Sequence, residues 1–168
     1  MFKKTALLLL MAGFVHGDDV QNGINAFKKK EYKTAAQLFQ KACNAGKFPG
    51  CYILGGMYEE GTVIKQDIRT AAKLYQKACN GGIAGGCYNL GLLHYNGNGV
   101  KHDSVKAIEF FTKACEGGDA MGCNNIGVIY ANGFRDTQSY AHALKYFAKA
   151  CDLKYEEGCK NYAKLKQR

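Results

Sequence analysis

The sequence predicts an all-α fold, a right-handed α-solenoid of stacked helix pairs with one disulfide in each repeat. Two observations lead to this prediction. Apolar residues recur at helical spacing, and no alternation typical of strands persists anywhere in the 168 residues. In addition, eight cysteines form two series with a period of 36 residues: Cys43, Cys79, Cys115 and Cys151, and Cys51, Cys87, Cys123 and Cys159. Such a period is typical of repeat architectures, in which each helix pair buries its apolar face against its neighbours.

The composition fits one folded domain with a basic surface. Hydrophobic residues make up 47% and charged residues 22% of the chain, which excludes a disordered or fibrous protein. The 23 lysines and arginines outnumber the 14 acidic residues, so the formal charge is +9. This charge favours acidic partners or anionic surfaces. Nucleic acid is not an expected partner, because no basic cluster is interleaved with exposed aromatic residues.

Residues 1–17 predict a secretory signal peptide. Lys3 and Lys4 give a basic start, residues 5–15 form an apolar run, and small or medium residues precede residue 18. The run is too short to span a hydrocarbon core of roughly 30 Å, so we expect no membrane span. We therefore expect residues 18–168 to form the mature repeat domain, in the periplasm or outside the cell, where disulfides persist.

The first helix pair is expected to be irregular. Residues 20–29 can form its first helix, but Lys28–Glu31 stands where the later pairs have a glycine-bounded turn. At the other end, Glu156–Lys166 is expected to close the array as a single helix with a polar exterior.

The helix that ends at the first cysteine of a unit is clearest over Asp67–Cys79. Its apolar positions form one helical stripe: Ile68, Ala71, Leu74, Tyr75 and Ala78. Asp67 is a favourable N-cap residue, and Asp103 and Ser139 stand at the same register. We expect these three residues to begin their helices.

The other helix of a unit starts near the second cysteine and is clearest over Gly86–Asn96. Gly97 follows it and suits the left-handed position after a helix, as do Gly61 and Gly133 at the same register. Pro49 falls in the first turn of such a helix, where its missing N–H costs nothing. A second glycine series predicts close approach of a neighbouring helix: Gly55, Gly91 and Gly127.

The repeat leaves two regular ways to pair the cysteines. Pairing within each unit uses every thiol: Cys43–Cys51, Cys79–Cys87, Cys115–Cys123 and Cys151–Cys159. The shifted pairing leaves Cys43 and Cys159 unpaired, which is unfavourable outside the cytoplasm. We expect the first pairing, with turns such as Asn44–Gly46 bringing residues eight apart within disulfide reach. Zinc is the less favoured alternative, since no C-x₂-C or C-x₄-C spacing occurs.

The units resemble a known repeat family. The motif L-G-x-x-Y-x-x-G from Leu54 to Gly61, followed by D-x-x-x-A-A-x-x-Y-x-K-A-C from Asp67 to Cys79, resembles the Sel1-like repeat, a relative of the tetratricopeptide repeat. The C-x₇-C spacing in every unit is similar to the Helicobacter cysteine-rich protein group. The sequence departs from the repeat at His94, where other units carry tyrosine, and at Lys154, where earlier units carry glycine.

The resemblance implies a secreted, TPR-like protein that binds penicillin or peptidoglycan-derived fragments and has weak β-lactamase activity. Such a hydrolase would have a role in antibiotic resistance. Sel1-like repeats in general are scaffolds for protein partners.

The residues themselves point to no catalytic site. A serine β-lactamase commonly uses S-x-x-K, and neither Ser104 nor Ser139, the two serines of the chain, starts that motif. T-x-x-K occurs at Thr62–Lys65 and Thr70–Lys73, a common surface spacing that we interpret as coincidence. The mature chain's histidines, His94, His102 and His142, lack zinc-ligand spacing, and His94 stands at a packing position. The catalytic residues are therefore unknown, and neither a cofactor nor a metal is predicted.

Binding is easier to derive from a solenoid, whose concave surface is lined by one helix of every pair. Four residues after the second cysteines are candidate binding residues: Tyr88, Asn89, Asn124 and Asn125. The amides of Asn89 and Asn125, which stand at equivalent register, could hydrogen-bond a ligand's amide or carbonyl groups, and inter-repeat hydrogen bonds or solvation are the alternative interpretation. Two functions remain open, a β-lactam-binding protein that hydrolyses its ligand slowly, and a non-catalytic scaffold for a peptide or protein partner.

Overall fold

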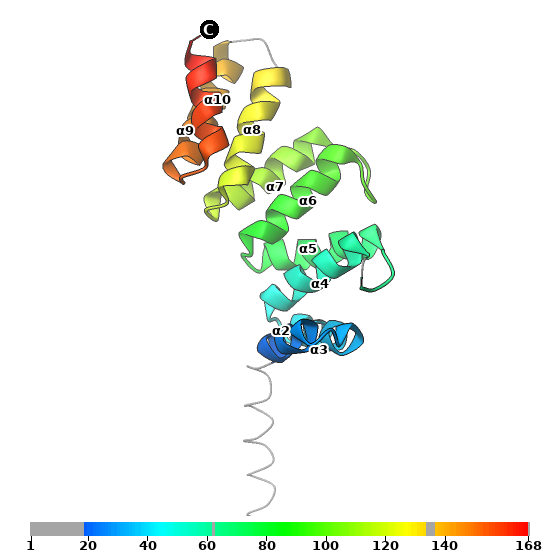
Figure 1. Ribbon diagram of the computed structural model, residues 1–168. Coiled ribbons are helices and arrows are strands. Elements are labelled where there is room, and N and C mark those ends of the chain that lie inside the picture. The colour runs from blue at the N-terminus through cyan, green and yellow to red at the C-terminus, as the bar shows by residue number, and fades with distance from the viewer. Residues whose placement is uncertain (1–18, 62, 134–136, 168) are drawn as a thin grey trace, which may run out of the picture. The chain divides into compact units, whose positions relative to one another are not determined.

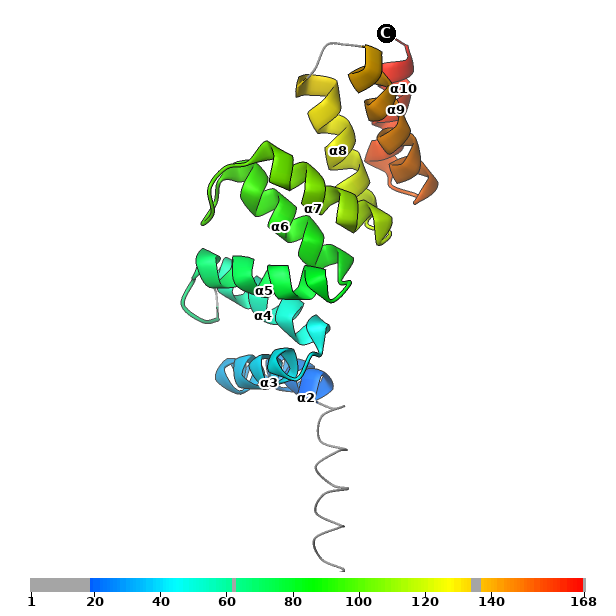
Figure 2. The ribbon, with the colours of Figure 1, turned by 180° about the vertical axis from the view of Figure 1, so that it is seen from behind.

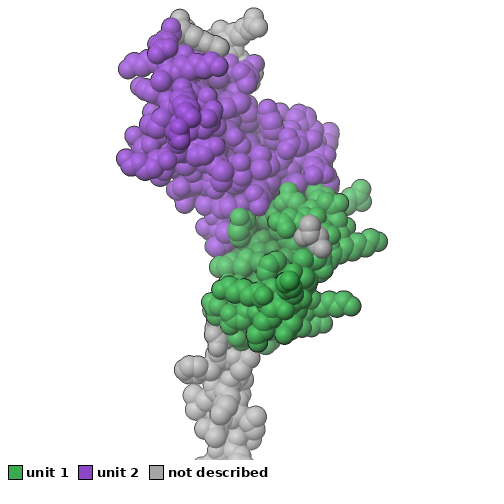
Figure 3. Space-filling view, viewed as in Figure 1, with its two compact units in different colours: residues 1–81 green, residues 82–168 purple. Residues whose placement is uncertain are grey.

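The structure is a computed structural model that describes residues 19–61, 63–133 and 137–167. The predicted signal peptide, residues 1–17, lies outside the described residues. The chain divides into two compact units, Met1–Gly81 and Gly82–Arg168, which Figure 3 shows in different colours. Each unit has helices and buried side chains of its own.

Unit 1 consists of two helix pairs. The first pair is α2 (Asp19–Lys28) and α3 (Tyr32–Asn44), and the second is α4 (Phe48–Glu60) and α5 (Ile68–Asn80). The helices of each pair pack against each other, and α3 also contacts α4 (Figure 1). Pro49 lies in the first turn of α4, as predicted.

Unit 2 consists of two further pairs and a closing helix. Helix α6 (Ala84–Asn96) packs against α7 (Ser104–Glu116), and α8 (Ala120–Gly133) packs against α9 (Thr137–Asp152). Helix α10 (Glu156–Lys166) contacts α9 and α8, an arrangement visible from both sides (Figure 1, Figure 2).

The all-α prediction is confirmed, because the described residues of both units form helices and turns and no strand. The closing helix has the predicted bounds. Among the described residues, no helix combines the length and the apolar character that crossing a membrane requires.

The predicted helix starts are confirmed at two of three positions. The Asp67 and Asp103 carboxylates accept hydrogen bonds of 3.0 Å from the backbone N–H groups of Thr70 and Lys106. The prediction is wrong for Ser139, because α9 begins at Thr137 and places this serine inside the first turn. Helix α9 has 16 residues, whereas α5 and α7 have 13. The extra residues lie at its N-terminal end, so α9 begins before the register at which Asp67 and Asp103 cap their helices.

Glycines bring the two helices of each pair close together. A Cβ atom at these positions would stand within 3 Å of a buried aromatic ring: 2.8 Å for Gly55 and Tyr75, 2.7 Å for Gly91 and Phe111, and 2.6 Å for Gly127 and Phe147. A carbon atom cannot approach a ring so closely, so only glycine fits. The close approach predicted from this glycine series is therefore confirmed in three pairs.

The disulfides connect the end of one helix to the start of the next. Three bridges follow the predicted pairing, Cys43–Cys51, Cys115–Cys123 and Cys151–Cys159, with Cα atoms 4.5–4.7 Å apart. Cys79 and Cys87 are also disulfide-bonded, so none of the eight cysteines, all of which are described, is free. Each repeat therefore carries one disulfide.

The turns between bridged cysteines need a left-handed residue. Gly46, Gly82 and Gly118 adopt positive φ angles of 76°, 83° and 89° there, and Lys154 takes the same conformation with φ 67°. Gly61 and Gly97 end α4 and α6 in the left-handed conformation, as predicted. Gly133 differs, because α8 includes it as its last residue.

Candidate binding groove

The first helices of the pairs in unit 2, α6 and α8, and the closing helix α10 form two neighbouring pockets. A pocket of about 310 Å³ lies between α6 and α8, with the buried Phe111 ring of α7 among its lining residues. A second pocket of about 150 Å³ lies between α8 and α10, with the buried Phe147 ring of α9 in the equivalent place. Val128 of α8 lines both pockets, which we call together the unit 2 groove.

The two pockets are built from equivalent positions of successive repeats. All lining residues of the first pocket except Tyr88 have a counterpart 36 residues later in the second: Leu92 and Val128, Tyr95 and Ala131, Asn96 and Asn132, Phe111 and Phe147, Asn125 and Asn161, Val128 and Lys164, and Ile129 and Leu165. The backbone therefore repeats the shape of the pocket, while the side chains change its chemistry.

Two of the four predicted binding residues line the first pocket. Tyr88 of α6 and Asn125 of α8 are both half-buried and hydrogen-bond each other across the pocket. Burial raises the pKa of the Tyr88 phenol above its ordinary value, and the hydrogen bond with Asn125 opposes that rise.

The other two predicted residues lie outside the lining of both pockets. Asn124 is buried, and its Oδ1 accepts a hydrogen bond of 2.9 Å from Nδ2 of Asn161 on α10. Asn89 is half-buried on α6. The hydrogen bonds of Asn125 with Tyr88 and of Asn161 with Asn124 join α8 to α6 and α10 to α8, at equivalent registers of successive repeats.

The sequence reasoning missed Asn161 and Lys164. The period itself could have found Asn161, because it stands 36 residues after Asn125 and 72 after Asn89. Both residues lie beyond the last cysteine, on a helix that the sequence predicted only as a cap. Lys164 replaces an apolar residue of the preceding repeat, so only the structure places it in a pocket.

Unit 1 contains a related pocket with a different lining. It has a volume of about 260 Å³ between α2 and α4, and Phe39 of α3 lies where Phe111 and Phe147 lie in unit 2. Ile53 stands at the register of Asn125. Since an isoleucine occupies this register in unit 1, packing of the fold does not require an amide there.

A larger, more open hollow of about 660 Å³ lies over α3 and α4 in unit 1. Two of its polar residues have partners close by. Gln40 Nε2 donates to Asn44 Oδ1 at 3.0 Å, and Lys41 Nζ lies 3.2 Å from the Asp19 carboxylate.

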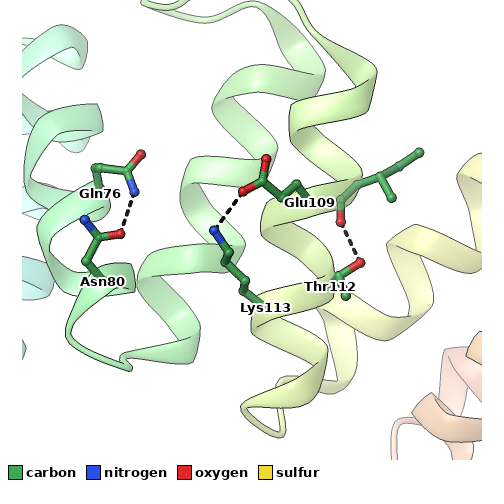
Figure 4. A network of polar contacts seen from close by, with 6 residues as sticks. Gln76, Asn80, Glu109, Thr112 and Lys113 are labelled. Carbon is green, nitrogen blue, oxygen red and sulfur yellow. Dashed lines mark hydrogen bonds and ion pairs between the residues drawn. The ribbon is translucent and has the colours of Figure 1, made fainter.

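Polar side chains on the second helices also bond within their own helix (Figure 4). The contacts are Gln76 Nε2 to Asn80 Oδ1 at 2.9 Å in α5, and Lys113 Nζ to Glu109 Oε1 and Thr112 Oγ1 to the Ile108 carbonyl, both 2.8 Å, in α7. The polar groups of these side chains are hydrogen-bonded within their own helices. The unit 2 groove is therefore the better candidate binding site.

One serine–histidine pair is brought together by the turn before α7. Ser104 Oγ lies 3.4 Å from His102 Nε2, and His102 Nδ1 lies 2.7 Å from the Tyr95 carbonyl oxygen. His102 is exposed, and neither Ser104 nor His102 lines the unit 2 groove. The sequence search missed this pair because it looked for a lysine three residues after each serine.

The remaining candidate groups have structural contacts. The Thr70 hydroxyl donates to the Asp67 carboxylate at 2.7 Å, whereas Thr62 lies outside the described residues. His94 is half-buried and stacks on Phe110 at 5.5 Å, which agrees with its packing role. In the part of the chain that the structure describes, no three His, Cys, Asp or Glu side chains gather as metal ligands would.

Comparison with known proteins agrees with this architecture. The Sel1 repeat family model matches residues 17–47, 49–83, 84–119 and 120–155. No curated protein matches the sequence.

Several solved structures are similar. A Sel1 repeat protein from Oxalobacter formigenes is 24% identical with a TM-score of 0.75, over 86% of this chain and 58% of that one. The protective antigen c5321 of uropathogenic Escherichia coli, which displays an SLR fold, is 29% identical with a TM-score of 0.78, over 86% of this chain and 32% of that one. Helicobacter pylori cysteine rich protein B is 31% identical with a TM-score of 0.54, over 64% of this chain and 92% of that one. The chain thus spans about three fifths and one third of the first two proteins.

Proposed function

Because the chain belongs to the Sel1 repeat family, we propose that it is an extracytoplasmic binding scaffold that holds an extended peptide segment of a protein partner in the unit 2 groove. Sel1 repeats typically mediate protein–protein interactions. The disulfide in each repeat is consistent with an oxidising compartment.

The observation that carries this proposal is the repetition of an amide-bearing pocket. Asn161 donates one N–H to Asn124 and Asn125 forms one hydrogen bond with Tyr88, and neither side chain makes another within the described part of unit 2. Each side chain therefore keeps one donor and one acceptor. A peptide bond offers the complementary acceptor and donor, so two such amides one repeat apart suit an extended backbone.

The disulfides support binding by holding the groove in shape. Cys115–Cys123 joins α7 to α8, and Cys151–Cys159 joins α9 to α10. In each pocket, the helix that contributes the buried phenylalanine ring is therefore joined by a covalent bond to a helix that lines one side of the pocket. A preorganised site loses less conformational entropy on binding, which favours affinity.

The proposal is tested by peptide binding to the full chain after removal of one groove amide. Immobilised protein would select peptides from a random library, and fluorescence anisotropy would give their affinities. Asn125→Ala is expected to weaken binding roughly tenfold, since it removes a hydrogen-bonding pair worth about 1–2 kcal/mol. The matched control is Asn98→Ala, at an exposed asparagine outside both pockets. Absence of any selected peptide, or equal loss in both variants with unchanged thermal stability, would refute the proposal.

Slow β-lactam hydrolysis, which the family resemblance implies, is the second candidate. The specific observation in its favour is the Ser104–His102 pair, since a histidine beside a hydroxyl can act as its general base. A chromogenic cephalosporin, added to protein purified free of contaminating lactamases, tests it. Turnover that is abolished in Ser104→Ala would support the enzyme, whereas no turnover in the wild-type protein would leave the scaffold.

A further inference from the structure

We propose that the unit 2 groove reads two side chains of one extended peptide: a large apolar side chain between α6 and α8, and an acidic side chain between α8 and α10. This inference rests on the proposed function and adds the chemistry of the partner.

The first pocket suits an apolar side chain. Its lining is uncharged, with Leu92, Ile129 and the Phe111 ring providing apolar surface and Tyr88 and Tyr95 providing aromatic surface. Tyr95 is 41% exposed, so part of this aromatic surface is uncovered. A volume of about 310 Å³ accommodates a leucine- or phenylalanine-sized side chain together with the backbone beside it.

The second pocket is smaller and carries a cation. Ala131 replaces the aromatic Tyr95, and Lys164 replaces the apolar Val128 of the first pocket. No carboxylate appears among the described lining residues of either pocket. A bound carboxylate would therefore meet the Lys164 ammonium and side-chain amides, without a competing anion inside the pocket.

Lys164 is available for such a partner. Lys160 on the same helix is paired with Glu156 at 2.7 Å, whereas the described part of the chain provides no ion pair for Lys164, which is exposed. Asn161 and Asn132 lie in the same pocket. A carboxylate that accepts from an ammonium and an amide forms charge-assisted hydrogen bonds, which are stronger than neutral ones.

The spacing of the helices sets the spacing of the two side chains. Packed helices lie about 8–10 Å apart, and an extended chain advances about 3.3 Å per residue. The two side chains should therefore be roughly three residues apart in the peptide. The basic overall charge of the chain agrees with an acidic partner.

The probe is a fluorescent hexapeptide, capped at both ends, with phenylalanine and glutamate three positions apart, prepared in both orders. Its comparison peptides carry glutamine or lysine for the glutamate, or alanine for the phenylalanine. In the favoured order, replacing glutamate by glutamine is expected to weaken binding to the full chain roughly three- to tenfold at low salt. Replacing phenylalanine by alanine is expected to weaken it by at least as much.

The matched variants are Lys164→Glu and Lys166→Glu, which make the same charge change on the same helix. Lys166 lies over the Tyr162 ring and outside the pocket lining. Lys164→Glu should abolish the preference for glutamate over glutamine and favour the lysine peptide, while Lys166→Glu should retain the preference. Thermal melts establish that both variants fold.

The outcomes separate this inference from the proposed function. If the phenylalanine peptides bind but glutamate, glutamine and lysine are equivalent, the acidic specificity is overturned and the scaffold stands. An uncapped peptide tests a free C-terminal carboxylate. If binding depends on Lys164 only for the uncapped peptide, the specificity for an acidic side chain is likewise overturned and the scaffold stands. If no peptide binds, both proposals fall.

Discussion

A lysine occupies a left-handed backbone position that glycines occupy in the earlier repeats. Lys154 has φ 67°, and Gly118 has φ 89° at the equivalent position one repeat earlier. The left-handed conformation costs a residue with a side chain roughly 1–2 kcal/mol. The repeated turn therefore places a strained residue where the sequence departs from the family pattern.

Lys154→Gly is expected to raise the free energy of unfolding by about 0.5–1 kcal/mol. Relief of the strain is partly offset by the larger entropy of glycine in the unfolded chain. Urea unfolding measures this change. The reverse replacement, Gly118→Lys, should lower the free energy of unfolding, and since a Cβ at Gly118 meets nothing within 4 Å, the effect is one of backbone alone. Lys154→Gly with no gain in stability would contradict this explanation.

Two adjacent glycines of α4 should respond to alanine with opposite signs. A Cβ on Gly55 would lie 2.8 Å from the Tyr75 ring, whereas on Gly56 its nearest contact is the Tyr75 hydroxyl at 3.7 Å. Gly55→Ala should destabilise the protein by about 1–3 kcal/mol through overpacking. Gly56→Ala should stabilise it by about 0.5–1 kcal/mol through helix propensity. Thermal melts of the two variants measure both changes. Equal effects on stability would show that the Tyr75 ring does not limit how closely α4 and α5 approach each other.

Single helices are defined by their ends as much as by their apolar faces. Asp67 and Asp103 begin α5 and α7, and hydrogen bonds to these caps lower the pKa of both carboxyl groups. A carboxyl group whose pKa is lower in the folded state binds fewer protons there than in the unfolded state. The stability it contributes is present above its unfolded pKa and is lost as the pH falls through the folded pKa.

The pH dependence of unfolding should therefore contain a contribution from the caps. The double variant Asp67→Asn and Asp103→Asn keeps an oxygen acceptor at each cap but removes the titration. Its urea midpoint is expected to fall less steeply than that of the wild type as the pH is lowered from about 6 through the normal aspartate range near 3.9. An unchanged slope in the double variant would exclude the caps as its source.

The period predicted the helices well because the local signals repeat with it. Asp67 and Asp103 are followed by the same stripe of small and aromatic residues, so their caps followed from the sequence. Ser139 was predicted by register alone, and α9 starts earlier than the register requires. The pocket chemistry could not be derived in this way, because Lys164 becomes a groove residue only through the packing of α10 on α8.

At the scale of the whole molecule, stability is expected to depend on the covalent bridges. Each disulfide closes a short loop, and loop-closure entropy gives about 2.5 kcal/mol for each. The double variant Cys115→Ala and Cys123→Ala should lose about this amount of unfolding free energy, measured by urea unfolding. The matched variant in unit 1 is the double replacement Cys43→Ala and Cys51→Ala, which removes a loop of the same length. Thiol titration of the unreduced wild-type protein should find no free thiol, and detection of one would contradict the pairing.

The central claim is that the unit 2 groove binds an extended peptide through its repeated amides. The most direct measurement is a titration of the ¹⁵N-labelled full chain with the capped phenylalanine–glutamate hexapeptide, followed by ¹H–¹⁵N NMR. We expect the side-chain amide signals of Asn125 and Asn161 to shift first, together with backbone signals of α6, α8 and α10. Shifts confined to unit 1 or to the outer faces of α7 and α9, or no shifts at all, would contradict it.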